Sequence, residues 1–212
     1  MTPHIAWMNR SEPLLIVISA PSGGGKTTLC KQLLAARPGV TRAITCTTRP
    51  PRPGERDGVD YYFLDETTFA RRLQADEFIE HATVYGYRYG VLKAELLGKL
   101  NQGNDVLLQV DVQGAATIRA KARLEPQLNR AIVTVFLTPP TLAELERRLR
   151  TRGQDTLEVI QRRLGVARAE IACWREFDYL LISASPEEDL RRVLAIIEAE
   201  KMRTSRAQPP EF

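Results

Sequence analysis

A short apolar segment that runs straight into a glycine-rich turn constrains the fold of this chain more than any other feature. Residues 14–18 are all Leu, Ile or Val, and the turn Ala20-Pro21-Ser22-Gly23-Gly24-Gly25 follows after one serine. β-Branched residues favour strands, whereas glycine and proline favour turns, so we expect a buried strand that enters a tight turn. A helix is predicted to begin beside Lys26 and to stop at Pro38-Gly39.

The end of this turn matches the phosphate-binding pattern GxxxxGK[ST]. Gly25-Lys26-Thr27 fills its last three positions, and Ala20 stands where the first glycine usually falls. Backbone N–H groups of such a turn, together with the positive end of the following helix, bind phosphate. Lys26 is expected to bridge the β- and γ-phosphates of ATP, and the Thr27 hydroxyl to bind Mg²⁺. The predicted ATP-binding residues are Ala20, Pro21, Ser22, Gly23, Gly24, Gly25, Lys26, Thr27 and Thr28.

Further apolar runs at residues 106–110, 132–137 and 179–182 alternate with segments of helical periodicity, such as 92–100 and 142–149. This alternation predicts an α/β fold of the P-loop NTPase type, in which helices flank a parallel sheet. Asp111 directly follows one of the predicted strands. Its carboxylate is therefore expected at the carboxyl edge of the sheet, where it can join Thr27 in binding Mg²⁺.

Two stretches interrupt the alternation. The first, residues 45–92, is rich in proline, glycine, arginine and tyrosine, and the second, residues 141–175, is helical and crowded with arginine. Arg49 and Arg52 lie three residues apart in a proline-stiffened segment, so two guanidinium groups can face one phosphate at little ordering cost. Tyr61 and Tyr89 are candidate neighbours of that phosphate.

Composition narrows the class of protein. The chain has 212 residues and 43% hydrophobic content, which suits one domain with insertions, and its net charge of +4 fits an anionic small substrate or nucleic acid. No apolar run approaches the ~20 residues needed to cross a bilayer, so we expect a cytoplasmic protein without a membrane partner. Cys30, Cys46 and Cys173 form no CxxC pair, which argues against a zinc site or a disulfide framework. Two histidines argue against His-based general base catalysis.

Seven motifs follow one another in a fixed order over residues 14 to about 203. They are Ser19-Ala20-Pro21-Ser22-Gly23, Thr47-Thr48-Arg49, Pro53-Gly54-Glu55, Gly58-Val59-Asp60-Tyr61-Tyr62-Phe63, Glu77-Phe78-Ile79-Glu80, Asp111-Val112-Gln113-Gly114 and Arg152-Gly153-Gln154-Asp155. In sequence and order they resemble the guanylate kinases, of bacterial type. The resemblance implies a P-loop core (12–44, 94–140 and 176–205), a GMP-binding insertion (45–93) and a lid (141–175). Residues 1–11 and 206–212 are predicted to be disordered tails.

The resemblance also implies roles for particular residues. Arg49, Arg52, Tyr61 and Tyr89 hold the GMP phosphate, Thr45 lies near the base, and Glu80 reads guanine. A carboxylate accepts hydrogen bonds from guanine N1–H and N2–H₂, whereas adenine presents an acceptor at N1. Arg148, Arg152 and Arg163 correspond to lid arginines of the family. With Lys26 and Arg49 they form the predicted catalytic set.

Three residues depart from the family pattern. Val91 stands where the family usually has Ser or Thr in the GMP site, so one hydrogen bond to guanine O6 is missing. Gln109 replaces an acidic residue that helps to read the base, although an amide can still donate to O6 or N7. Ser183 replaces an asparagine near adenine.

The predicted reaction is Mg²⁺-dependent phosphoryl transfer from ATP to GMP or dGMP. Its partners are these nucleotides, without nucleic acid, and a homo-oligomer remains open. Two anions must be brought into line, so charge neutralisation and positioning do the work and no general base is needed. Three alternatives stay open: a kinase of the same fold for ribose bisphosphate or another monophosphate, a non-catalytic module that recognises phosphorylated peptides, and a nucleic-acid binder.

Overall fold

The computed structural model describes residues 11–151 and 156–207, which form two sheets and their helices. The main sheet has five parallel strands in the order β2-β7-β1-β8-β9. These strands are β1 Leu15–Ser19, β2 Val40–Arg42, β7 Asp105–Gln109, β8 Ile132–Thr138 and β9 Tyr179–Ile182. The predicted α/β fold with a parallel sheet is confirmed, and β1 lies at its centre.

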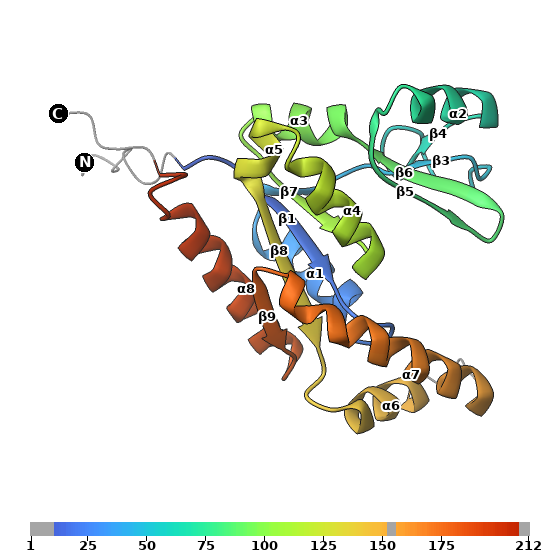
Figure 1. Ribbon diagram of the computed structural model, residues 1–212, viewed down its shortest axis with the longest axis vertical. Coiled ribbons are helices and arrows are strands. Elements are labelled where there is room, and N and C mark those ends of the chain that lie inside the picture. Colours follow the sequence, from blue (N-terminus) through green and yellow to red (C-terminus); the bar gives the residue numbers. More distant parts are fainter. Residues whose placement is uncertain (1–10, 152–155, 208–212) are drawn as a thin grey trace.

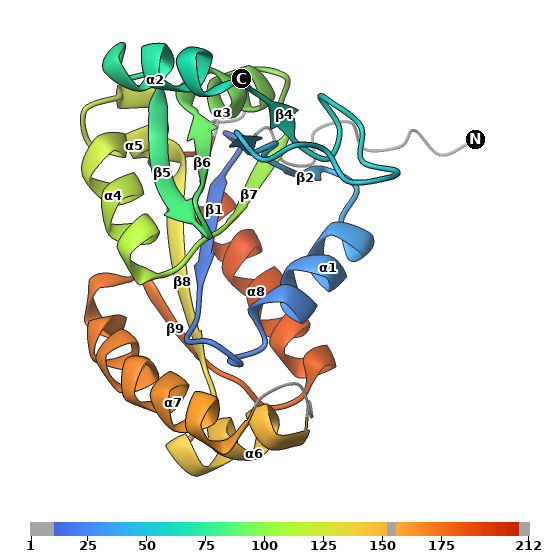
Figure 2. The ribbon, with the colours of Figure 1, turned by 90° about the vertical axis from the view of Figure 1, so that its right-hand side faces the viewer.

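Helices cover both faces of the main sheet because alternate residues of its strands point to opposite sides. Leu15 and Val17 pack with one set of helices, α3 Lys93–Asn101, α4 Val112–Ala122 and α5 Pro126–Ala131. Ile16 and Ile18 pack with α1 Lys26–Ala36 and α8 Pro186–Lys201 on the other face. Figure 2 shows α1 and α8 on one side of the sheet and α4 with α5 on the other.

A smaller, four-stranded sheet has the order β4-β3-β6-β5. It consists of β3 Cys46–Thr47, β4 Tyr62–Phe63, β5 Phe78–Val84 and β6 Tyr87–Leu92, and α2 Glu66–Gln74 lies against it. These elements all fall within residues 45–93. Figure 1 shows the small sheet and α2 at one end of the molecule, with α6 Leu142–Thr151 and α7 Leu157–Ala172 at the other. A short 3₁₀ helix, η1 Cys173–Glu176, leads from α7 toward β9.

Asp76 joins the small sheet to the core at one corner. Its two carboxylate oxygens accept hydrogen bonds from Lys93 Nζ at 2.7 Å and from Lys121 Nζ at 2.6 Å. These two bonds lower the pKa of Asp76 to about 2, with the Lys121 bond contributing most. Lys121, on α4, also donates to the Phe78 carbonyl oxygen at 2.7 Å, so the base of β5 is held against α4.

The predicted boundaries of both tails need correction. Arg206, assigned to a disordered tail, is 8% exposed and donates to the carbonyl oxygens of Arg130 (2.8 Å) and Ile132 (3.1 Å) and to the Glu200 carboxylate. Ser11, also assigned to a tail, forms an antiparallel bridge with Ala207. The apolar pattern begins after Ser11 and ends before Arg206, but buried backbone acceptors and a buried carboxylate hold the arginine in the fold.

The three cysteines are free thiols: Cys30 and Cys46 are buried, and Cys173 is half-buried. None of the helices within residues 11–151 and 156–207 is long and apolar enough to span a membrane.

Candidate active site

The predicted phosphate-binding turn forms a cavity at the carboxyl end of β1. Gly23 (φ 87°) and Gly25 (φ 101°) adopt left-handed backbone conformations, which glycine takes without a steric penalty, and the Gly24 N–H donates to the Pro21 carbonyl at 2.9 Å. The cavity measures about 310 Å³. Its lining comprises Ala20, Pro21, Ser22, Gly23, Gly24, Gly25, Lys26, Thr27, Thr28, Asp111 and Glu170. All nine residues predicted to bind ATP are therefore in one place.

Lys26 begins α1 and reaches across the cavity. Its Nζ donates to the Val110 carbonyl oxygen, at the end of β7, at 2.6 Å. Burial lowers the pKa of Lys26, and the nearby negative charges of Asp111 and Glu170 oppose that shift. An anion entering the cavity would stabilise the charged ammonium group in the same way.

Thr27 and Asp111, the predicted Mg²⁺ ligands, both line this cavity. Asp111 is the N-cap of α4, where Oδ1 accepts from the Gly114 N–H at 2.8 Å; among the described residues Oδ2 makes no hydrogen bond and can face a cation. Thr27 Oγ1 accepts from Gln109 Nε2 at 3.0 Å and keeps a second lone pair. One hydroxyl and one carboxylate fit Mg²⁺, which takes few protein ligands and several from phosphate and water. Among the described residues there is no group of three or more acidic, His or Cys side chains that could hold a metal by itself.

Glu170 is a cavity residue that the sequence analysis did not identify. It comes from α7, and its carboxylate accepts a hydrogen bond from the Ser22 backbone N–H. Its Oε2 is buried without a hydrogen-bond partner among the described residues. Burial raises the pKa of Glu170, while the Ser22 bond and the charge of Lys26 act in the opposite direction. A carboxylate thus lies in a cavity whose backbone suits phosphate.

Arg49 lies on the small sheet side, just after β3, and is 9% exposed. Its Nη2 makes two hydrogen bonds to the Glu55 carboxylate, at 2.8 and 2.9 Å, and Nη1 donates to the Pro50 carbonyl at 2.7 Å. Its guanidinium carbon lies 5.4 Å from the centre of the Tyr61 ring. Hydrogen bonds to Glu55 and Tyr89 raise the pKa of Arg49, with Glu55 contributing most. Glu55, which sequence motifs included without a role, therefore fixes the orientation of Arg49.

The other residues predicted to bind GMP through this part of the chain are Arg52, Tyr61, Tyr89 and Thr45. The rings of Tyr61 and Tyr89 lie edge to face with centroids 6.2 Å apart. Arg52 is exposed, and its backbone N–H donates to Glu55 at 2.7 Å. Thr45 is half-buried, and its carbonyl oxygen accepts from the Tyr62 N–H at 3.0 Å. The structure thus brings Arg49, Tyr61 and Tyr89 into contact, with Arg52 on the same loop.

Glu80 lies on β5 where that strand crosses the start of α4. A β-carbon at Gly114 would lie 3.5 Å from Glu80 Cγ and 3.4 Å from Asp111 Oδ1, so both carboxylates pack over the same turn. Burial raises the pKa of Glu80 to about 7, and the negative charge of Asp111 adds to the shift. The residue predicted to read guanine thus lies beside a residue of the phosphate cavity.

Val91 and Gln109, both predicted to lie in the GMP site, have different neighbours in the structure. Val91 pairs with Glu80 across the small sheet but is 3% exposed and packs in the core cluster with Leu96 and Leu100. Gln109 contacts Thr27 on the phosphate side. Among the described residues, the Gln109 side chain makes no hydrogen bond to Glu80.

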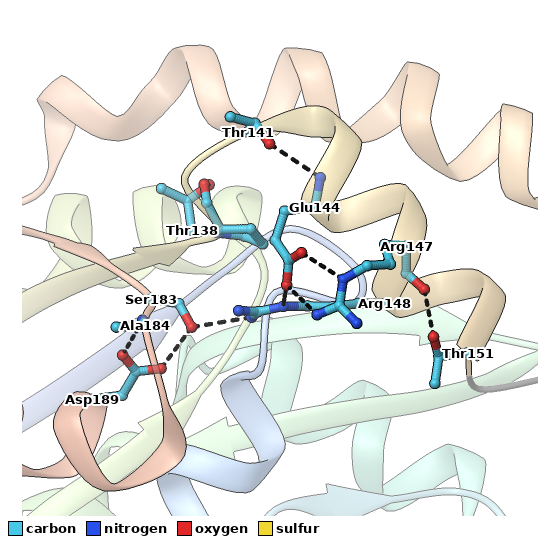
Figure 3. Close-up of polar contacts among 10 residues, drawn as sticks. Thr138, Thr141, Glu144, Arg147, Arg148, Thr151, Ser183, Ala184 and Asp189 are labelled. Atoms are coloured by element: carbon cyan, nitrogen blue, oxygen red, sulfur yellow. Dashed lines mark hydrogen bonds and ion pairs between the residues drawn. The ribbon is translucent and has the colours of Figure 1, made fainter.

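Of the three predicted lid arginines, Arg148 and Arg163 lie within the described residues. Arg148, on α6, donates from Nε to Glu144 at 2.8 Å and from Nη1 to Ser183 Oγ at 3.0 Å (Figure 3). Arg163 lies half-buried on α7, and Arg152 falls outside the described residues. Arg148 Nη1 would lie 3.8 Å from a β-carbon at Gly25, so this arginine is already beside the phosphate-binding turn.

Comparison with known proteins gives a consistent result. The family model described as guanylate kinase matches residues 12–200. A guanylate kinase of Nitrobacter hamburgensis is 43% identical over 193 residues, which cover 91% of this chain and 85% of that protein. One from Maricaulis maris is 40% identical over 204 residues, covering 96% and 91%. The crystal structure of guanylate kinase from Anaplasma phagocytophilum superposes with a TM-score of 0.69 at 32% identity, over 94% of this chain and 92% of that one. The chain therefore belongs to the guanylate kinase family of nucleoside monophosphate kinases.

Proposed function

We propose that this chain transfers the γ-phosphoryl group of ATP to the 5′-phosphate of GMP or dGMP in the presence of Mg²⁺, giving ADP and GDP or dGDP. The observation that best supports this substrate pair is the position of Asp111. It lines the phosphate cavity and also lies next to Glu80, on the small sheet. A donor triphosphate in the cavity and a base at Glu80 would therefore be neighbours.

On the donor side, backbone N–H groups of the turn that are not bonded within it, together with the N-terminus of α1, would hold the β-phosphate. Lys26 would exchange its bond to the Val110 carbonyl for bonds to the β- and γ-phosphate oxygens. Arg148, beside Gly25, would neutralise charge that develops on the transferred group. Thr27 and Asp111 would hold Mg²⁺, which, when bound, neutralises phosphate charge during the transfer.

On the acceptor side, Arg49 would bind the GMP phosphate with help from Tyr61, Tyr89 and Arg52. Because Glu55 and Pro50 already fix the Arg49 guanidinium, little side-chain entropy remains to be lost on binding. The ionised form of Glu80 would accept from guanine N1–H and N2–H₂. The phosphate oxygen of GMP is itself the nucleophile, so these residues have to align and neutralise rather than remove a proton.

The test is ADP release measured in parallel for GMP, dGMP, AMP, UMP and ribose 1,5-bisphosphate at equal concentrations. The proposal requires GMP or dGMP to give the highest kcat/KM, at least tenfold above AMP and UMP. A higher kcat/KM with ribose bisphosphate or with another monophosphate would show that this compound, and not GMP, is the acceptor. Failure of every acceptor to stimulate ADP release, with intact ATP binding, would favour a non-catalytic binding module.

A further inference from the structure

Asp189 and Ser183 form a buried chain of hydrogen bonds that ends at Arg148. Ser183 follows β9 directly and is 5% exposed, and Asp189 lies in the first turns of α8 and is also 5% exposed. We propose that Ser183 and Asp189 are positioning residues that hold the guanidinium group of Arg148 against the phosphate-binding turn. This inference rests on the proposed function, in which Arg148 contacts the transferred phosphoryl group.

The direction of each hydrogen bond in this chain is fixed by chemistry. The Asp189 carboxylate can only accept: Oδ1 takes the Ala184 N–H at 2.9 Å and Oδ2 takes the Ser183 hydroxyl at 2.7 Å. The single hydroxyl proton of Ser183 is therefore donated to Asp189. Its oxygen faces Arg148 Nη1 at 3.0 Å with lone pairs only, and a guanidinium group can only donate. The chain has no alternative arrangement that keeps all of its bonds.

A second residue fixes the other side of the guanidinium group. Glu144, one turn earlier on α6, accepts from Arg148 Nε at 2.8 Å and also binds Arg147 at 2.7 and 2.8 Å (Figure 3). Both arginines lower the pKa of Glu144 to about 2, Arg147 contributing more, so the carboxylate is ionised at neutral pH.

Within residues 11–151 and 156–207, these two anchors leave the Nη2 group and one Nη1 proton of Arg148 for a ligand. Nη1 lies beside Gly25, at 3.8 Å from a β-carbon position there. Leu145 and Leu149, on the same helix as Arg148, are fully buried against Gly23. A pre-positioned guanidinium group loses little entropy when phosphate arrives, and the negative charge of Asp189 acts on it through the Ser183 hydroxyl.

The experiment is a double-mutant cycle between Ser183 and Arg148 in the full chain. Ser183→Ala is expected to lower kcat about tenfold, the usual cost of a hydrogen bond to a charged group, with the KM for GMP unchanged within about twofold. In an Arg148→Ala background, itself at least about a hundredfold slower, Ser183→Ala should change kcat no further. Ser183→Thr keeps the hydroxyl and should restore most of the activity.

A matched control separates positioning from general damage to this loop. Ser185→Ala removes the N-cap of α8, whose hydroxyl accepts from the Glu188 N–H at 3.2 Å, without touching Arg148. It should lower the melting temperature and leave kcat unchanged. Asp189→Asn, which keeps the shape but removes the charge, should lower kcat as Ser183→Ala does. If it fails to fold, the Ser183 variants alone decide.

The outcomes are distinct. Wild-type kcat in Ser183→Ala, with Arg148→Ala impaired, would overturn the positioning role and leave the proposed function intact. Equal loss from Ser183→Ala in both backgrounds would overturn it too, since the effect would not pass through Arg148. If GMP stimulates no ADP release, the Kd of a non-hydrolysable ATP analogue with Mg²⁺ replaces kcat in the same cycle. Non-additive weakening would then support positioning while the acceptor assignment fails.

Discussion

The side chain of Leu149 fills the space that a β-carbon would need at Gly23. Leu149 Cδ2 would lie 2.8 Å from that β-carbon, and Leu145 Cδ1 would lie 3.2 Å from it. Helix α6 therefore packs directly on the phosphate-binding turn, although it belongs to the stretch predicted as a lid. Leu145 and Leu149 are both fully buried there.

Gly23→Ala should consequently impair both stability and ATP binding. The new methyl group meets Leu149, and the φ of 87° is strained for any residue with a β-carbon, at a cost of about 1–3 kcal/mol. For a chain of this size the melting temperature should fall by about 2–10 °C, and the Kd of an ATP analogue should rise. Thermal unfolding and calorimetry measure the two. Gly39→Ala, where a β-carbon meets nothing within 4 Å, is the control and should lose no ATP affinity.

Lys26→Ala should lower kcat by roughly a hundred- to thousandfold, because no other lysine lines the cavity and transition-state charge loses its main partner. The fold should persist, since burial already disfavours the charged ammonium group. Steady-state kinetics and circular dichroism test this, with Lys31→Ala, an exposed lysine of the same helix, as the matched control. Near-normal turnover in Lys26→Ala would contradict the proposed donor site.

GMP binding should strengthen as the pH rises through about 7. Burial and Asp111 raise the pKa of Glu80 to about 7, so the ionised form that accepts two guanine N–H groups dominates only above that pH. The KM for GMP should therefore fall between pH 6 and 8. The phosphate of GMP titrates as well, so Glu80→Gln is the control: it should keep the phosphate effect, lose the step near pH 7 and bind GMP roughly 10- to 100-fold more weakly.

Without nucleotide, the raised pKa of Glu80 makes the folded protein less stable, not more, as the pH rises through about 7. A carboxyl group whose pKa is higher in the folded state favours folding when protonated, and that contribution is lost as the pH rises from about 4.5 through about 7. Glu80→Gln should thus raise the melting temperature at pH 8 and leave it nearly unchanged at pH 5. A melting temperature lowered at pH 8 would show that ionised Glu80 is not under strain.

Glu170→Gln should tighten ATP binding. The Glu170 carboxylate lies in the phosphate cavity against the Ser22 N–H, where its charge repels an incoming triphosphate. Removing that charge while keeping the shape should lower the Kd of an ATP analogue roughly three- to tenfold, measured by calorimetry at low salt. Glu158→Gln, an exposed acid of the same helix, should have no such effect. Weaker ATP binding in Glu170→Gln would instead mean that the charged carboxylate holds the phosphate-binding turn in its binding conformation through the Ser22 N–H.

The fold could be predicted largely because its strands are continuous apolar runs. β1, β7, β8 and β9 all lie within one or two residues of the predicted segments. β2 was missed because it has only three residues, beside Pro38-Gly39, and gains its stability from pairing with β7. Tertiary pairing decides such short strands, and local sequence carries little signal for them.

The site divides in a similar way. Gly25, Lys26 and Thr27 were predictable because their geometry is local to one turn. Contacts between distant segments were not, among them Glu170 with Ser22 and Arg148 with Ser183, which are 35 residues apart. Glu55 is an intermediate case: it lies six residues from Arg49, and its proximity to two arginines was a usable signal.

The hydrogen bonds of Asp76 hold one end of the small sheet against the core, so any rotation of the sheet would move its other end farther. Lys121 ties Asp76 and the Phe78 carbonyl to α4, whereas the opposite end of the β5–β6 hairpin, at Tyr85, is 96% exposed. Glu80 lies two residues from the fixed end, and Arg49 follows Thr47, which pairs with Tyr89 nearer the tip. Any swing of the sheet about this pivot carries Arg49 through a longer arc than Glu80. Such a hinge would keep Glu80 near its place beside Asp111 while the side of the sheet that carries Arg49 adjusts its position.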